Sequence, residues 1–112
     1  MMNREELLKL ADRCEQADGP SYALECDIAK ALNPNFTRMT VPKNYTTSID
    51  AAMQLVPEGM IWLELRHFSD GDWGCNLCLL GMKVDGVKGV ARTKELALCA
   101  AALRAIADMK EG

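Results

Sequence analysis

The stretch MIWLELRHF at residues 60–68 decides the fold, because its side chains change character at every second position. The apolar positions are Ile61, Leu63 and Leu65, and between them stand Trp62, Glu64 and Arg66. A period of two is that of a β-strand, whose successive side chains point to opposite faces of a sheet. We therefore predict a strand from Met60 to Phe68 with one apolar face and one mixed face.

Two further segments extend this strand into a small sheet. Residues 75–80, CNLCLL, form a nearly continuous apolar run that is short enough for a strand covered on both faces. Residues 69–74 read as the turn that pairs it antiparallel with the first strand. Residues 82–92 carry Val84, Val87 and Val90 among glycines, which predicts a loop or a third strand at the edge.

Helical patterns flank this region on both sides. Apolar residues recur at helical spacing, and capping residues mark the starts of the segments. The predicted helices span residues 3–17, 20–33, 47–55 and 94–109. A polar connection with two prolines, residues 34–44, separates the second helix from the third. The sequence thus predicts a single α+β domain over residues 1–112. We expect a three-layer α/β/α sandwich with a small antiparallel sheet of two or three strands, and helices before and after it.

The composition excludes several classes of protein. The 112 residues are 49% hydrophobic and 26% charged with a net charge of -3, which is typical of one globular domain. With no run of about 18 apolar residues and no leader pattern, we expect a cytoplasmic protein without a membrane partner. The acidic balance argues against nucleic acid, since a protein that neutralises several phosphates needs a basic face.

A double-stranded RNA-binding domain is an alternative, because it also runs α-β-β-β-α. Its final helix would begin here with only Arg92 and Lys94 as basic residues. The first hairpin turn carries Asp70 and Asp72, whose charge opposes docking to phosphates. We therefore do not expect nucleic-acid binding.

The Asp70-Gly71-Asp72 sequence itself lacks the further ligands of a calcium loop and is typical of a hairpin turn.

The cysteines and the histidine point to no catalytic centre. Five cysteines are an odd set, which favours reduced thiols packed as small hydrophobic residues. Cys75 and Cys78 have the spacing of half a zinc site, but a strand would place them on opposite faces. His67 is the only histidine and has no companion nucleophile motif. We expect neither a metal nor a cofactor, and no enzymatic activity.

Three stretches together resemble a known family. They are Gly19-Pro20 followed by Asp27-Ile28-Ala29, then residues 45–52 running to Val56-Pro57-Glu58-Gly59 and Trp62, and finally Ala91-Arg92-Thr93 leading into residues 96–105. The chain resembles the phage ABA sandwich domain, a small protein of bacteriophages and prophages. The resemblance implies an α/β/α sandwich and a phage origin, and it implies no catalytic residues. The Cys75–Cys78 hairpin and residues 82–90 lie outside the family pattern.

Two groups of residues are candidates for binding. At the start of the last helix, free backbone N–H groups and nearby cations could hold a phosphate or carboxylate; the residues are Lys88, Arg92, Thr93 and Lys94. An ordinary capped helix with solvated cations is the alternative. On the mixed strand face, Trp62 and Arg66 could align with Trp73 as a platform for a nucleobase or a partner chain. The alternative there is a tryptophan that packs under a helix.

These observations favour a phage or prophage accessory protein that binds a host or phage protein without catalysis. A homo-oligomer is expected, because the valine-bearing edge at residues 84–90 could pair with another subunit. The alternative is a counter-defence protein that sequesters an anionic small molecule such as a nucleotide. In that case Arg92, Thr93 and Lys94 would bind the phosphate, and Trp62 or Trp73 would stack on the base.

Overall fold

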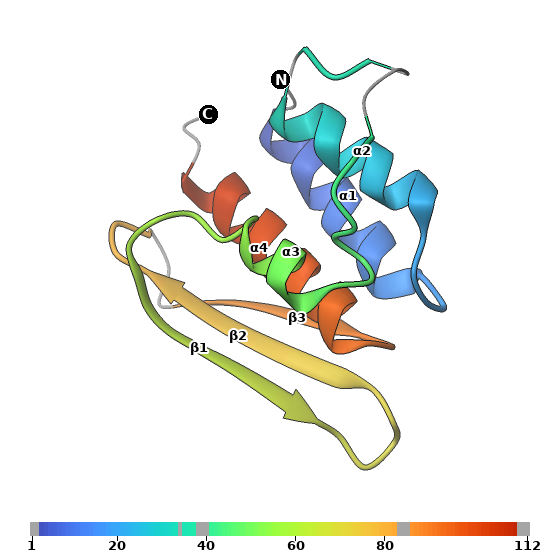
Figure 1. Cartoon of the computed structure of the whole chain (residues 1–112). Helices are drawn as coiled ribbons and strands as arrows, with labels where there is room; N and C mark the ends of the chain where they lie inside the picture. Colours follow the sequence, from blue (N-terminus) through green and yellow to red (C-terminus); the bar gives the residue numbers. More distant parts are fainter. Residues whose placement is uncertain (1–2, 34, 38–40, 83–85, 110–112) are drawn as a thin grey trace.

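The computed structural model of the chain describes residues 3–33, 35–37, 41–82 and 86–109 (Figure 1). Its elements in chain order are α1 (Arg4–Gln16), α2 (Tyr22–Leu32), α3 (Ile49–Met53), β1 (Met60–His67), β2 (Trp73–Leu79), β3 (Val87–Ala91) and α4 (Lys94–Met109). The α+β class is confirmed, with an antiparallel sheet and helices before and after it. Within residues 82–92, predicted to be a loop or a third strand, the structure has a strand over Val87–Ala91. Val84 lies outside the described residues.

Local capping explains where the helices begin. Asn3 caps α1 by accepting a hydrogen bond from the Glu6 N–H at 2.9 Å, and Ser48 caps α3 by accepting from the Ala51 N–H. Ser21 caps α2 through the Leu24 N–H, so the helix begins two residues after Pro20 rather than at it. Thr93 caps α4 as predicted, with its Oγ1 accepting from the Leu96 N–H at 3.1 Å.

The sheet has the order β1-β2-β3, and both pairs are antiparallel. Trp62 lies opposite Cys78, and Glu64 lies opposite Asn76, which in turn lies opposite Lys88 on β3. The register shifts once, between Met60 and Trp62. From Trp62 onward the strand pairs regularly, so its side chains keep the predicted alternation between two faces.

Helix α4 lies between the sheet on one side and the α1–α2 pair on the other (Figure 1). The layers are therefore sheet, α4 and the α1–α2 pair. This differs from the predicted sandwich with a helix on each face of the sheet. Within the described part of the chain, the second face of the sheet carries exposed side chains, among them Trp62 and Val90. The apolar run in β2 arises because Cys75, Leu77 and Leu79 are buried under α4, while Cys78 turns to the other face.

Small residues allow β3 and α4 to approach closely. A Cβ added to Gly89 would lie 2.3 Å from the Ala97 carbonyl oxygen and 2.8 Å from the Ala101 nitrogen. Atoms do not approach that closely, so only glycine fits at this position. Helix α4 is buried on nearly every side, which is the pattern of a central helix.

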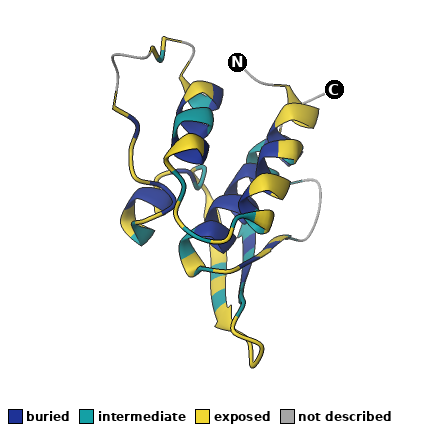
Figure 2. Cartoon of the chain, turned by 90° about the vertical axis from the view of Figure 1, so that its right-hand side faces the viewer, coloured by how far each residue is buried: buried dark blue, intermediate teal, exposed yellow. Residues whose placement is uncertain are grey.

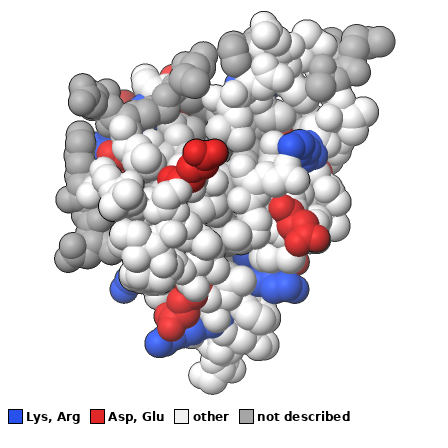
Figure 3. All heavy atoms as spheres, turned by 60° about the vertical axis from the view of Figure 1, so that its left-hand side comes forward, with Lys and Arg blue, Asp and Glu red and all other residues white. Residues whose placement is uncertain are grey.

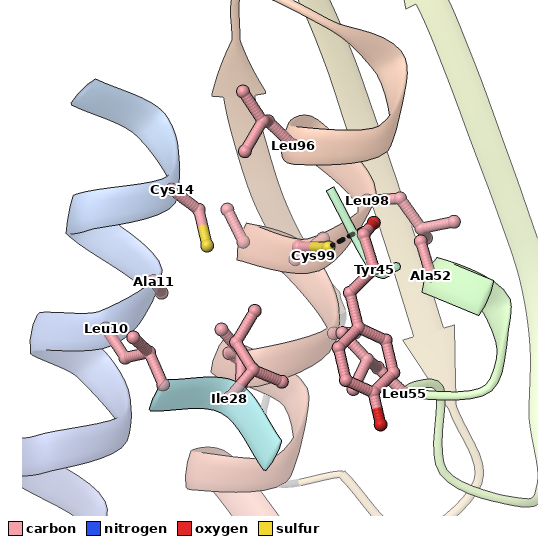
Figure 4. Close-up of a cluster of buried hydrophobic side chains, with 14 of the residues drawn as sticks. Leu10, Ala11, Cys14, Ile28, Tyr45, Ala52, Leu55, Leu96, Leu98 and Cys99 are labelled. Carbon is pink, nitrogen blue, oxygen red and sulfur yellow. Dashed lines mark hydrogen bonds between the residues drawn. The ribbon is translucent and has the colours of Figure 1, made fainter. Parts of the chain in front are cut away.

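The core lies where α1, α2 and α3 meet α4. Figure 2 shows buried residues on the inner sides of the helices and exposed residues on their outer sides. Cys14 of α1, Ile28 of α2 and Ala52 of α3 converge on Leu98 and Cys99 of α4 (Figure 4). Helix α4 covers one face of the sheet, the other helices pack mainly on α4, and the opposite face of the sheet is left as the surface on which a site can form.

Candidate functional site: the uncovered face of the sheet

Side chains from all three strands line the face of the sheet that turns away from α4. We call this surface the outer face, and it consists of Trp62, Glu64, Arg66, Phe68, Asn76, Cys78, Lys88 and Val90. Trp62 is 45% exposed, Val90 43% and Phe68 38%, although large apolar side chains usually turn inward. The alternative in which Trp62 packs under a helix is therefore wrong for this structure.

Charged and polar groups form a row across the middle of the outer face. Arg66 Nε lies 3.2 Å from Glu64 Oε1, and the same carboxylate oxygen accepts a hydrogen bond from Asn76 Nδ2 at 3.3 Å. Lys88 lies opposite Asn76 on β3 and is exposed. The row thus carries two cations and one carboxylate. A view turned 60° from Figure 1 shows separate charged groups on a largely uncharged surface (Figure 3).

A shallow pocket lies on this face. Its volume is about 220 Å³, and its lining includes Arg66, Phe68, Asn76, Lys88 and Val90. The Phe68 ring lies over Gly74, since a Cβ there would come within 2.6 Å of the ring. The glycine therefore lets an aromatic ring form one wall of the pocket. Cations, an amide and apolar groups surround a hollow that can accept a side chain of a partner.

Trp73 does not join Trp62 and Arg66. It is the first residue of β2, opposite His67, and it packs partly against the core on the side of α4. The Trp73 and His67 rings stack with their centroids 4.4 Å apart and 11° between their planes. Lys94 Nζ lies 5.8 Å from the Trp73 ring centroid, a cation–π arrangement. The predicted platform with both tryptophans is therefore wrong, and Trp73 instead supports the start of α4.

The cations at the start of α4 already have partners. Arg92 Nε lies 4.0 Å from Asp72 Oδ1, and Lys94 Nζ lies 3.3 Å from Glu95 Oε2. Trp62 pairs with Cys78 near the opposite end of β2 from Trp73, about 17 Å away at the rise of a strand. The structure thus brings Trp73 and Lys94 together, and it separates both from Trp62.

The outer edge of β3 is capped by two residues that the sequence reasoning missed. Glu15 Oε2 accepts a hydrogen bond from the Val90 N–H at 2.8 Å, and Arg104 Nη1 donates to the Lys88 carbonyl oxygen at 2.8 Å. These backbone groups face away from β2, where a further strand would bind. At Lys88 and Val90 the backbone groups that a second subunit would need are therefore already hydrogen-bonded, which argues against the predicted oligomer through the edge at residues 84–90. Residues 84 and 85 of that edge lie outside the described residues. No signal in the sequence links Glu15 to Val90.

Burial makes three of the thiols poor nucleophiles. It raises the pKa of Cys14 to about 12 and that of Cys75 to about 11, and it also raises the pKa of Cys99. The Cys99 thiol donates a hydrogen bond to the Tyr45 carbonyl oxygen at 3.3 Å (Figure 4). Cys75 and Cys78 lie on opposite faces of β2, as predicted. Each therefore packs separately.

Among residues 3–33, 35–37, 41–82 and 86–109, no group of three or more His, Cys, Asp or Glu side chains is placed to hold a metal ion. No helix in the described part of the chain is long and apolar enough to cross a membrane. No family model, no curated protein and no solved structure matches the chain.

Proposed function

We propose that this chain is a non-enzymatic binding module that recognises a partner protein through the outer face. The observation that carries the proposal is the combination of exposed Trp62, Phe68 and Val90 with Arg66 and Lys88 on one uncovered sheet face. Exposed apolar groups with a polar rim mark sites of protein interaction. Tryptophan and arginine contribute most to binding energy in such interfaces. A partner of host or phage origin agrees with the family resemblance.

The shape of the outer face favours a protein over an enclosed small molecule. Pockets that bury a small ligand usually measure about 300–1,000 Å³, whereas the pocket beside Arg66 measures about 220 Å³ and opens onto the sheet. A single partner side chain fits a hollow of this size. The surrounding side chains of Lys88 and Val90 would then meet the rest of the partner surface.

Cross-linking at Lys88 tests the proposal. A photoreactive amino acid placed at Lys88 should form an adduct with a protein other than this chain in cells that carry the gene. The matched control is the same amino acid at Tyr22, which is 65% exposed on α2, away from the sheet. We expect an adduct of defined mass from Lys88 and none from Tyr22. Equal adducts from both positions would contradict the proposal.

The partner obtained in this way allows a quantitative test. Val90→Asp places a charge in the apolar part of the face, and Trp62→Ala removes the largest exposed side chain. Each change should weaken binding by at least about tenfold, as expected for residues that anchor an interface. Unchanged affinity in both variants would show that another surface binds the partner.

Sequestration of an anionic small molecule is the competing outcome. The carboxylates of Asp72 and Glu95 lie 4.0 Å and 3.3 Å from Arg92 and Lys94, so an anionic ligand at these cations would meet neighbouring negative charge. A thermal-shift screen with nucleotides and cyclic nucleotides should therefore produce no shift. A shift of several degrees that Arg92→Ala abolishes would favour nucleotide binding instead, because a ligand that prefers the folded state stabilises it by mass action.

A further inference from the structure

The two edges of the sheet differ in how they are protected. The β3 edge is covered by the side chains of Glu15 and Arg104. The β1 edge has no backbone partner among the described residues, because β1 pairs with β2 alone. Proteins usually protect such edges with charged side chains, above all lysine, or with proline, bulges or a covering segment. Among the described residues, β1 from Trp62 to His67 has no lysine, proline, bulge or covering strand; its charged side chains Glu64 and Arg66 form an ion pair with each other, and its one irregularity lies before Trp62.

The pairing pattern shows which groups of β1 are free. The Phe68 N–H donates to the Asp72 carbonyl oxygen at 2.8 Å, so the backbone of Phe68 turns toward β2. Backbone groups in an antiparallel pair alternate in direction along each strand. The N–H and C=O groups of Leu63, Leu65 and His67 therefore point away from the sheet. These residues offer a row of donors and acceptors for a further antiparallel strand.

Exposed apolar side chains are concentrated around this edge. Of the described residues, Ile61 is 59% exposed and Leu80 is 72% exposed, and Met60, Trp62 and Phe68 are also exposed. Leu63 and Leu65 face the side of α4 but are only half-buried. An added strand would remove more of their apolar surface from water.

The charged residues of β1 favour a second copy of the same strand as the partner that pairs with this edge. A two-fold axis at Leu65 places Glu64 opposite Arg66 of the second copy, and Arg66 opposite its Glu64. An axis at Glu64 would place two carboxylates together, and an axis at Arg66 would place two guanidinium groups together. A register shifted by one residue would place the free backbone groups of one β1 strand opposite groups of the other β1 strand that are already bonded to β2. Only the axis at Leu65 pairs opposite charges twice and keeps both apolar faces aligned.

We propose that two copies of this chain join through β1, antiparallel about Leu65, into one continuous six-stranded sheet. The dimer uses the backbone of the edge and does not depend on the proposed partner of the outer face. On the outer face Trp62 would lie opposite Phe68 of the second copy, beside the two Glu64–Arg66 pairs. On the opposite side, Leu65 would meet its own equivalent.

Charge reversal tests both the dimer and its register. The dimer dissociation constant is measured by analytical ultracentrifugation under reducing conditions, so that the free cysteines cannot form disulfide-linked dimers. Glu64→Arg and Arg66→Glu each create two like-charge contacts and should weaken self-association by about tenfold or more. An equimolar mixture of the two variants should dimerise again, because every cross-strand contact then joins an arginine to a glutamate.

The mixture separates the proposed contact from effects within one chain. Each variant loses its internal Glu64–Arg66 ion pair, and mixing does not restore that pair. Lys88→Glu is the matched control, since Lys88 lies on the same face but on β3, and it should leave dimerisation unchanged. Circular dichroism of each variant establishes that it is folded. A variant that does not fold is replaced by Glu64→Lys or Arg66→Asp, which create the same like-charge contacts.

Amide hydrogen exchange gives a second, structural measurement on the wild-type chain. As concentration rises, the N–H groups of Leu63, Leu65 and His67 should become protected together. A wild-type chain that remains monomeric up to about 1 mM would overturn the proposal. So would a dimer that tolerates both single reversals, or a mixture that does not associate. None of these results depends on whether the outer face binds another protein.

Discussion

Arg104 and Glu15 join three elements of the fold at one point, although they are 89 positions apart in the sequence. Arg104 Nη1 lies 2.7 Å from Glu15 Oε2, and Nη2 lies 2.7 Å from Oε1, so the contact is bidentate. The same carboxylate accepts from the Val90 N–H, while the guanidinium donates to the Lys88 carbonyl oxygen. Helices α1 and α4 thereby hold the edge of β3.

Replacement of Glu15 should therefore destabilise the whole domain. Glu15→Gln removes the charge from a bidentate pair whose side chains are only 26% and 21% exposed. We expect a loss of about 1–3 kcal/mol in the free energy of unfolding, measured by urea denaturation. Glu5→Gln is the control, because its pair with Lys9 is 77% and 74% exposed and should contribute less than about 0.5 kcal/mol. Equal effects of the two changes would contradict this role.

The same pair predicts a dependence of stability on pH. Hydrogen bonding from Arg104 lowers the pKa of Glu15 below its ordinary value. Folding therefore favours the ionised carboxylate, and this stabilisation is complete above the unfolded pKa. It should be lost as the pH falls below about 4.5 and through the lowered pKa of the folded state. Urea denaturation from pH 7 to pH 3 should show a smaller decrease for Glu15→Gln than for the wild type.

A methyl group at Gly89 should be poorly tolerated. In Gly89→Ala the new Cβ would overlap the Ala97 carbonyl oxygen, and backbone atoms cannot rotate away as a side chain does. We expect a loss of at least about 2 kcal/mol in the free energy of unfolding. Gly19→Ala is the control, since nothing lies within 4 Å of its added Cβ. A neutral Gly89→Ala variant would show that β3 and α4 are farther apart than described.

A buried carboxylate fixes the connection before α3. Glu25 Oε2 accepts hydrogen bonds from the Thr46 Oγ1 hydroxyl at 2.7 Å and from the Thr46 N–H at 3.1 Å. Both residues are buried, at 6% and 0% exposure. Thr46→Val removes the hydroxyl that donates to the carboxylate at 2.7 Å and should cost about 1–3 kcal/mol in the free energy of unfolding, measured by urea denaturation. Thr47→Val is the control, because Thr47 is exposed and its hydroxyl lies 3.4 Å from Glu25. The interpretation fails if both substitutions cost the same.

Thiol reactivity should divide the cysteines into two groups. Cys14, Cys75 and Cys99 are buried and have raised pKa values, whereas Cys26 and Cys78 are half-buried. In the native protein at pH 8, a disulfide reagent should react rapidly with Cys26 and Cys78 only, because the thiolate is the reactive form. In denaturant all five thiols should react at similar rates. Rapid native reaction at Cys75 would contradict the burial of β2 under α4.

Local sequence predicted the elements well because their signals lie within a few residues. Thr93 satisfies an N–H three positions ahead, and the alternation of residues 60–68 needs only the geometry of one strand. The candidate site was predicted in part. Trp62 and Arg66 share a face, as predicted. Lys88, which the sequence grouped with Arg92, Thr93 and Lys94, lies on that face too, whereas Trp73 lies on the opposite face with His67.

The sequence by itself determined the order of helices and strands, their approximate ends and the two faces of each strand. Periodicity specifies which side chains share a face, but it does not specify which element packs on that face. The tertiary structure decided that α4 covers one face of the sheet, that Trp62 is exposed on the other, and that Glu15 caps the edge of β3. These outcomes depend on the packing of segments far apart in the chain, where burial of apolar surface and close approach at Gly89 select the arrangement.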